Sequence, residues 1–165
     1  MANIKYRLSS TRNLEDLALL TDIASAARDK KPLPTQASKY ALEGIKERMA
    51  RQEADTLAAV EGSRIVGYVL THPLLPYGNN EADADALHLS MMMAHPEYWG
   101  TGLAVDLAEA ATKRARTLGL RRITLWTNKI DNDRALAFYK KMGFAPNGQQ
   151  KTNEHGQQIM LQKIL

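Results

Sequence analysis

A strand-like apolar run that leads through two glycines into an amphipathic stretch constrains the fold of this chain more than any other feature. The run is residues 87–94, LHLSMMMA, and Gly100 and Gly102 follow it with one residue between them. Over residues 103–118 apolar side chains recur at helical spacing, and Gly119 is placed to end that helix. The succession predicts a strand, a glycine turn and a helix. If the strand is straight, alternate side chains share one of its faces: His88, Ser90, Met92 and Ala94.

Apolar patterns elsewhere predict further elements in an order that mixes hairpins with crossovers. Glu61-Gly62-Ser63 separates two apolar runs at hairpin spacing, and Asn13 is a candidate helix cap. In chain order we expect a strand over 4–8, a helix from Asn13, a second helix that opens at Thr35, a hairpin over 55–73, the strand and helix described above, a strand over 122–127, a helix over 132–142, and strands near 147–152 and 157–164. Because no segment has the composition of a linker, we expect one mixed α/β domain that spans residues 1–165.

Composition excludes several classes of protein. With 44% hydrophobic and 24% charged residues, the chain has a globular composition rather than a disordered one. No apolar run approaches the ~20 residues of a membrane helix, the N-terminus lacks a secretory signal, and cysteine is absent. We therefore expect a cytoplasmic protein with no metal site and no membrane partner. The net charge of +4 comes from dispersed basic residues with few interleaved aromatics, so nucleic acid is not an expected partner.

The glycine turn has a chemical use as well as a structural one. The first N–H groups of a helix have no internal partners, and the aligned peptide dipoles place about half a positive charge there. Glycines leave room for a phosphate to approach the backbone, so the turn predicts a phosphate site. It lacks the third glycine of a dinucleotide-binding fingerprint and the Gly-Lys-Ser/Thr of a P-loop. A purely structural turn is the competing interpretation.

A second motif gives the glycine turn its context. Together with residues 132–144, NDRALAFYKKMGF, the turn resembles the GNAT superfamily of acetyl-coenzyme A-dependent N-acetyltransferases. Residues 99–104 are similar to that family's pyrophosphate motif, Q/R-x-x-G-x-G/A, and residues 132–144 to its N-x-x-A-x-x-F/L-Y-x-x-x-G-F pattern. One departure is Trp99, which stands where the family usually has Gln or Arg. If backbone N–H donors make most of the contacts to the phosphates of the cofactor, this departure has only a modest effect on cofactor binding.

The resemblance implies a fold and a cosubstrate. The fold is a GNAT-type three-layer arrangement, with a central, mostly antiparallel sheet of about six to seven strands and helices on both faces. The cosubstrate is acetyl-CoA. Met92, Met93 and Ala94 match the strand end that pairs with the pantetheine arm, and Asn132 matches a residue that contacts the cofactor from the next helix. The segment that matches the family's pyrophosphate-binding turn comprises Gly100, Thr101, Gly102, Leu103, Ala104 and Val105.

The resemblance also implies catalytic roles. Tyr139 stands at the position that protonates the coenzyme thiolate, and a phenol with a pKa of about 10 is protonated at neutral pH. For the base, His88 is one candidate, because imidazole accepts protons near pH 7. A water chain to Glu81, Asp83 or Asp85 is another. Either residue could instead be structural, with Tyr139 packed on its helix and His88 satisfied by hydrogen bonds.

The acceptor is the least constrained part of the prediction. In the family, the pocket is built from segments that correspond to residues 25–40, 71–86 and 147–158. The leading expectation is a small-molecule primary amine that attacks the thioester directly. Two alternatives stay open: a protein N-terminal or lysine acetyltransferase, and a non-catalytic acyl-CoA-binding regulatory module. Family members are often dimers, so a homodimer is a further expectation.

Overall fold

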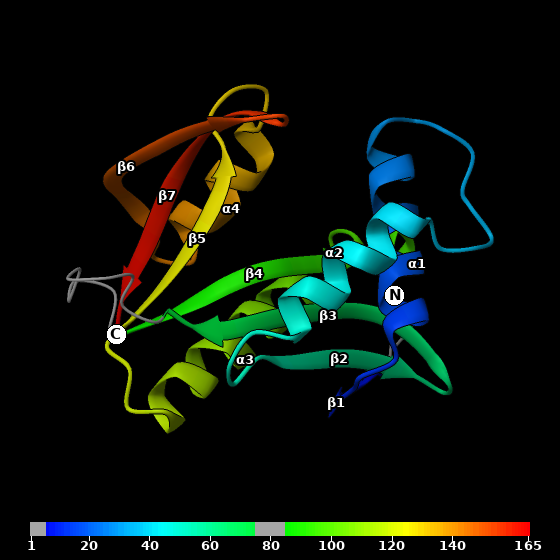
Figure 1. Cartoon of the computed structure of the whole chain (residues 1–165), viewed down its shortest axis with the longest axis horizontal. Helices are drawn as coiled ribbons and strands as arrows, with labels where there is room; N and C mark the ends of the chain where they lie inside the picture. Colours follow the sequence, from blue (N-terminus) through cyan, green and yellow to red (C-terminus); the bar gives the residue numbers. More distant parts are fainter. Residues whose placement is uncertain (1–5, 75–84) are drawn as a thin grey trace. The chain divides into compact units, whose positions relative to one another are not determined.

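The computed structural model describes residues 6–74 and 85–165, and Figure 1 shows the path of the chain. The described elements, in chain order, are β1 (Arg7–Ser10), α1 (Leu14–Arg28), α2 (Lys39–Met49), β2 (Asp55–Glu61), β3 (Arg64–Pro73), β4 (Ala86–Ala94), the 3₁₀ helix η2 (Pro96–Tyr98), α3 (Leu103–Thr117), β5 (Arg122–Asn128), α4 (Asp133–Lys141), β6 (Ala145–Asn153) and β7 (Gly156–Ile164).

The strands form a mixed sheet in which antiparallel pairing dominates. The seven strands follow the order β1-β2-β3-β4-β5-β7-β6. The pairs β1–β2, β2–β3, β5–β7 and β6–β7 are antiparallel, whereas β4 and β5 are parallel. The parallel register covers three pairs, from Ala86–Arg122 to His88–Thr124. The predicted mixed α/β fold, with a mostly antiparallel sheet of six to seven strands, is confirmed.

The chain divides into two compact units, and each is discontinuous in sequence. The first comprises residues up to His72 together with Met91–Ala110, and the second comprises Pro73–Ser90 together with Ala111–Leu165. Both β4 and α3 therefore contribute residues to each unit. The expectation of a single domain over residues 1–165 stays a prediction.

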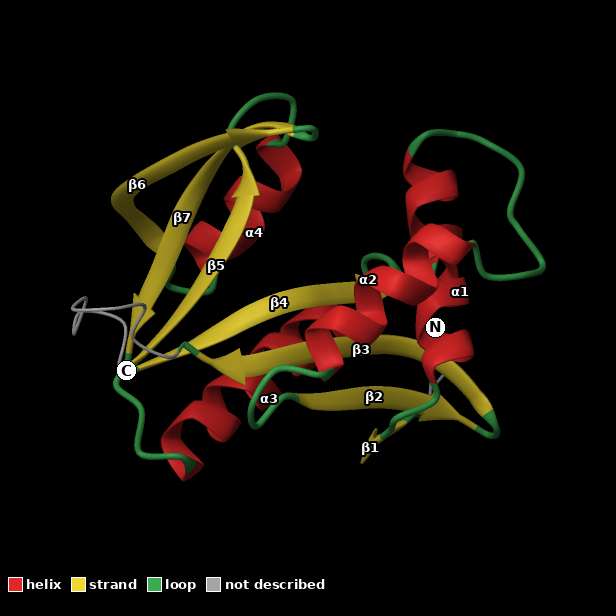
Figure 2. Cartoon of the chain, in the orientation of Figure 1, coloured by secondary structure: helices red, strands yellow, loops and turns green. Residues whose placement is uncertain are grey.

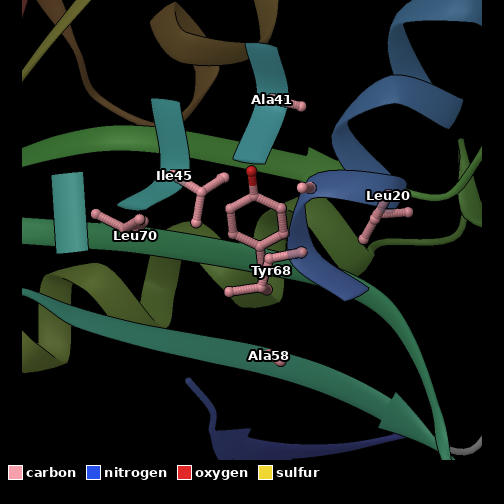
Figure 3. Close-up of a cluster of buried hydrophobic side chains, with 8 residues drawn as sticks. Leu20, Ala41, Ile45, Ala58, Tyr68 and Leu70 are labelled. Carbon is pink, nitrogen blue, oxygen red and sulfur yellow. The ribbon is translucent and has the colours of Figure 1, made fainter. Parts of the chain in front are cut away.

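Two helices cover one face of the strands in the first unit. Tyr68 of β3 is fully buried, and Figure 3 shows its ring among Leu20, Ile45 and Leu70. Its hydroxyl is 2.6 Å from the hydroxyl of Thr21 in α1, so the buried polar atom is satisfied. Ile45 of α2 belongs to this cluster, and Leu42 and Met49 of the same helix pack against it. Helices α1 and α2 thus pack on the same face of β2 and β3 (Figure 2).

The opposite face of β3 meets α3. Gly67 precedes Tyr68, and side chains alternate between the faces of a strand. A Cβ placed at Gly67 would lie 2.9 Å from Cδ2 of Leu103 and 3.2 Å from Cδ1 of Leu107. The missing side chain therefore lets α3 approach the strand closely. In this unit the helices lie on both faces, as expected.

The second unit is built on the β5–β7–β6 strands and α4. Strand β5 pairs with β7 along its whole length, from Arg122–Ile164 to Asn128–Gln158. Ile123 and Leu125 of β5 are buried. Phe144, which follows α4, is also buried and holds the end of that helix through its N–H, which donates to the carbonyl of Tyr139.

The expected boundary of the second helix is wrong. Helix α2 begins at Lys39 rather than at Thr35, because Ser38 is its cap and its hydroxyl accepts from the N–H of Ala41. The N–H and hydroxyl of Ser38 in turn donate to the Asp22 carboxylate at 2.6 and 3.1 Å. Position 38 is thereby fixed by a contact that spans 16 residues. The Asn13 cap of α1 is confirmed, since its side chain accepts from the N–H of Asp16.

Candidate cofactor and catalytic sites

The glycine turn has the backbone that its sequence requires. Gly100 and Gly102 have φ of +78° and +90°, in the left-handed region that side chains disfavour. A Cβ at either position would meet no described atom within 4 Å beyond its chain neighbours, so the space in front of the turn is open. The absent side chains leave a concave backbone surface, not a packed one.

Several N–H groups face this space without an internal partner. The first helical bond of α3 runs from the N–H of Asp106 to the carbonyl of Gly102. The five N–H groups of Gly100, Gly102, Leu103, Ala104 and Val105 have no hydrogen-bond acceptor within the described part of the chain. These donors, together with the positive end of the helix, form a fitting cradle for a phosphate.

Buried contacts hold the turn in place within the first unit. Tyr98 is 4% exposed, its hydroxyl donates to the Glu61 carboxylate, and its carbonyl accepts from the Thr101 hydroxyl at 2.5 Å. Leu103 is fully buried at the start of α3. The pKa of the Glu61 carboxyl is lowered, first by the Tyr98 hydrogen bond and then by Arg64. The turn is thus anchored by buried residues on both of its sides, Tyr98 and Leu103.

A bulge in β3 also positions the turn. In the β2–β3 register Ala59 pairs with Gly67 and Val60 pairs with Ile65, so Val66 is an extra residue in β3. The carbonyl of Val66 accepts from the N–H of His95 at 2.8 Å. Sequence reasoning missed Val66 and Gly67. The only available signal was a glycine inside a strand pattern, which indicates a bulge or a close approach.

The end of β4 has an edge that faces away from β3. The Met93 carbonyl lies beside Gly67 and the His95 N–H bonds to Val66, so residues 93 and 95 direct their backbone groups toward β3. Because these directions alternate along a strand, Met92 and Ala94 direct theirs to the opposite edge. Of the three residues expected to pair with the pantetheine arm, Met92 and Ala94 are the two with suitably directed groups.

Trp99 closes one position on this edge. Its indole Nε1 donates to the Ala94 carbonyl at 3.0 Å, and the side chain is 39% exposed. The residue that departs from the family motif thus folds back onto the strand end that precedes the turn.

His88 lies in the second unit and is buried. It is 9% exposed, and its Nδ1 lies 2.9 Å from the Thr124 hydroxyl of the paired strand β5. This contact fits the structural interpretation of His88 that the sequence left open. Its role as a base stays a prediction. Of the competing relay residues, Asp85 forms an ion pair with Arg122 at 3.0 Å, and Glu81 and Asp83 lie outside the described residues.

Tyr139 combines an apolar setting with a hydroxyl that makes no hydrogen bond to the described part of the chain. Its ring centroid lies 5.4 Å from that of Phe138 and 5.7 Å from that of Phe144, both edge to face. Burial raises the pKa of the Tyr139 hydroxyl above its ordinary value. Over residues 6–74 and 85–165, no hydrogen bond involves that hydroxyl. A neutral donor of this kind has its proton available for transfer.

The side chain of Asn132 has a structural role that its sequence motif did not reveal. Its amide nitrogen donates to the Thr127 hydroxyl at 2.8 Å and to the Asn128 carbonyl at 2.9 Å. The side chain therefore ties the end of β5 to the start of α4, and it makes no cap bond to the helix. Only its carbonyl oxygen is left to accept a hydrogen bond from a ligand.

The expected site residues thus fall into two groups. Met92, Met93, Ala94 and residues 100–105 belong to the first unit, whereas His88, Asn132 and Tyr139 belong to the second. Their joint action is a proposal that rests on the sequence motifs.

Comparison with known families decides the identity of the fold. The model of the acetyltransferase (GNAT) family matches residues 19–144, about three quarters of the chain. The chain belongs to that family. The match includes both motifs that carried the resemblance, residues 99–104 and 132–144. It confirms that the chain is a member of the acetyltransferase family that these motifs indicated.

Individual relatives are distant in sequence but alike in fold. N-alpha-acetyltransferase 30 of Schizosaccharomyces pombe is 27% identical over 89 residues, which are 54% of this chain and 56% of that protein. The chain thus spans little more than half the length of this curated relative. The PaiA N-acetyltransferase of Thermoplasma acidophilum, solved in complex with coenzyme A, has a TM-score of 0.67 at 16% identity, over 98% of this chain and 100% of that one. Aminoglycoside 6'-acetyltransferase type Ii has a TM-score of 0.71 at 20% identity, over 96% of each chain.

The described residues also lack two kinds of feature. In the ranges 6–74 and 85–165, no helix is both long and apolar enough to cross a bilayer. In the same ranges, no three His, Asp or Glu side chains gather as a metal would require.

Proposed function

We propose that this GNAT protein transfers an acetyl group from acetyl-CoA to a primary amine of a small molecule, by direct attack of the amine. The observation that carries the proposal is the open glycine turn, where five N–H groups before and at the start of α3 have no acceptor among residues 6–74 and 85–165. The family match supports the same cosubstrate. No cysteine is present, which agrees with a reaction that needs no thiol nucleophile.

In this proposal the first unit binds the cosubstrate. The N–H groups of residues 100–105 donate to the pyrophosphate oxygens, and the free edge of β4 at Met92 and Ala94 pairs with the amides of the pantetheine arm. Acetyl-CoA supplies the activated thioester.

The second unit supplies proton transfer. The Tyr139 hydroxyl donates its proton to the departing sulfur, and its raised pKa keeps that proton in place at neutral and mildly alkaline pH. Asn132 orients the start of α4, on which Tyr139 lies. His88 receives the proton of the incoming ammonium, directly or through water, and its bond to Thr124 fixes the ring.

A substitution in the turn tests the cosubstrate site. Gly102→Glu places a carboxylate in the open space in front of the unpartnered N–H groups, so coenzyme A binding should be lost through bulk and charge repulsion. Gly119→Glu is the matched control, because Gly119 lies at the other end of α3 with a φ of +72° and equally open surroundings. Isothermal calorimetry with coenzyme A measures both variants. Unchanged affinity in Gly102→Glu would refute the phosphate cradle.

A second candidate acceptor is the α-amino group of a protein. The curated relative is a protein N-alpha-acetyltransferase, and its 89-residue match favours this candidate. The two acceptors are separated by following thiol release from acetyl-CoA with a panel of small amines and a panel of peptides with free N-termini. Turnover on peptides alone would reject the small-molecule acceptor. Turnover on small amines alone would reject the peptide.

A further inference from the structure

We propose that Trp99 is a positioning residue that ends the cofactor-pairing edge of β4 at Ala94 and directs the pantetheine arm into the glycine turn. The inference rests on the proposed function, because it concerns how the same cosubstrate is held. It goes beyond that function in assigning a role to the residue that departs from the family motif.

The edge of β4 offers a limited set of hydrogen-bonding groups. Met92 and Ala94 direct their backbone groups away from β3, as the positions of the Met93 carbonyl and the His95 N–H require. Of these, the Ala94 carbonyl already accepts from the Trp99 indole at 3.0 Å. The edge is left with the Met92 N–H and carbonyl and the Ala94 N–H.

The hydrogen bond from Trp99 to the Ala94 carbonyl affects the register in which a ligand can pair with the edge of β4. An extended ligand that pairs with a strand edge can slip by two residues when equivalent groups continue along the edge. The indole already occupies the Ala94 carbonyl, which disfavours strand-like pairing beyond the Ala94 N–H. The next donors that the chain offers are those of Gly100 and Gly102, directly after Trp99. A ligand that is extended at one end and anionic at the other is then held in one alignment.

An indole is better suited to this positioning role than to direct binding of phosphate. Tryptophan has one N–H donor and no charge, and here the donor is spent on a backbone carbonyl. A Gln or Arg at the same position would have further donors for the phosphates. In this chain the backbone N–H groups of the turn must therefore supply the phosphate contacts. The exposed part of the indole lies at the corner between arm and phosphates.

Fluorescence tests whether Trp99 adjoins the bound cosubstrate. The chain has two tryptophans, so Trp126→Phe leaves Trp99 as the single emitter. Trp126 is half-buried in the second unit, under the Nζ of Lys151 at 4.3 Å from the ring centroid. We expect coenzyme A to shift or quench the Trp99 emission, with a midpoint equal to the calorimetric Kd. No change in emission at a concentration that saturates calorimetry would overturn the inference.

Trp99→Phe tests the alignment itself. The ring is kept and the N–H is lost, so coenzyme A should bind about tenfold more weakly, the range of one hydrogen bond. Pantetheine, which has only the arm, and adenosine 3',5'-bisphosphate, which has only nucleotide and phosphate groups, should keep the affinities that they have for the parent, so each should displace coenzyme A more readily from the variant. A merely structural role would weaken all three ligands together. That result, or unchanged coenzyme A affinity, would overturn the inference.

Failure of the inference and failure of the proposed function give different results. If the parent protein shows no calorimetric binding of coenzyme A, both fail. If it binds coenzyme A but neither the Trp99 emission nor the Trp99→Phe affinity responds, only the role of Trp99 fails. Should Trp99→Phe not fold, as judged by its melting temperature, the fluorescence result decides.

Discussion

Tyr139 shows how a residue acquires chemical meaning from its surroundings. Its place at i, i+3, i+4 spacing beside Ala135 and Phe138 equally predicts a packing residue on α4. In the structure it does pack, edge to face with Phe138 and Phe144. Its hydroxyl nevertheless makes no hydrogen bond within the described residues, and burial raises its pKa. Packing and proton donation are therefore compatible in this residue.

Tyr139→Phe should lower kcat by ~10²-fold, the usual contribution of a general acid. Because the substitution keeps the ring and both aromatic contacts, the Kd for coenzyme A and the melting temperature should change little. Steady-state rates with a reactive amine, together with calorimetry, check both expectations. An unchanged kcat would mean that water protonates the thiolate, and it would leave the non-catalytic interpretation of Tyr139 standing.

In the first unit, α3 packs against β3 at a glycine, where β3 has no side chain. Gly67 brings α3 against β3, and the extra residue Val66 holds His95 at the start of the turn. The geometry of the phosphate cradle thus depends on a strand that contributes no atom to it. We expect the packing of α3 on β3 to control cosubstrate affinity.

Gly67→Ala tests this dependence. The added Cβ would lie within 3.2 Å of Leu103, Leu107 and the Met93 carbonyl, so α3 or β4 must shift. We expect a loss of about 1–3 kcal/mol in the free energy of unfolding and a raised Kd for coenzyme A. Gly44→Ala is the control, because in α2 the new Cβ meets only the flexible end of Arg48 and alanine favours a helix. Equal stability of the two variants would contradict the close approach.

Local patterns predicted most elements but few of the contacts that align them. The glycine turn, the hairpin at Gly62 and the Asn13 cap involve neighbours in sequence, so the residue types alone indicate them. The start of α2 was misplaced because Ser38 is held by Asp22, and such a pairing leaves no local pattern. The same reason hid Val66 and the Thr124 partner of His88.

At the scale of the whole molecule, a buried tyrosine, Tyr68, and a half-buried one, Tyr139, make stability depend on alkaline pH. Burial raises the pKa of Tyr68 and of Tyr139 above the ordinary value of about 10. Below pH 10 both hydroxyls are neutral in the folded and unfolded chains, so the full stability is present. As the pH rises further, the unfolded chain releases these protons and the folded chain retains them, so the free energy of unfolding falls.

Denaturant unfolding at pH 9 and at pH 11 measures this fall. The Tyr68 hydroxyl should account for about 1.4 kcal/mol per pH unit above its unfolded pKa. Tyr68→Phe removes this ionisation, so the variant should lose less stability between the two pH values than the parent, although it also loses the bond to Thr21. Parallel losses in the two proteins would show that Tyr68 does not titrate on unfolding.

The interleaving of the two units along the chain bears on synthesis at the ribosome. The first unit cannot be completed until Met91–Ala110 have been synthesised. The second unit, which begins with residues 73–90, also needs the whole chain after Ala110. The nascent chain must therefore carry the bare Gly67 face of β3 until Leu103 and Leu107 have emerged. During that interval the growing polypeptide exposes apolar surface to other chains, which makes this stage of translation the one most in need of a chaperone.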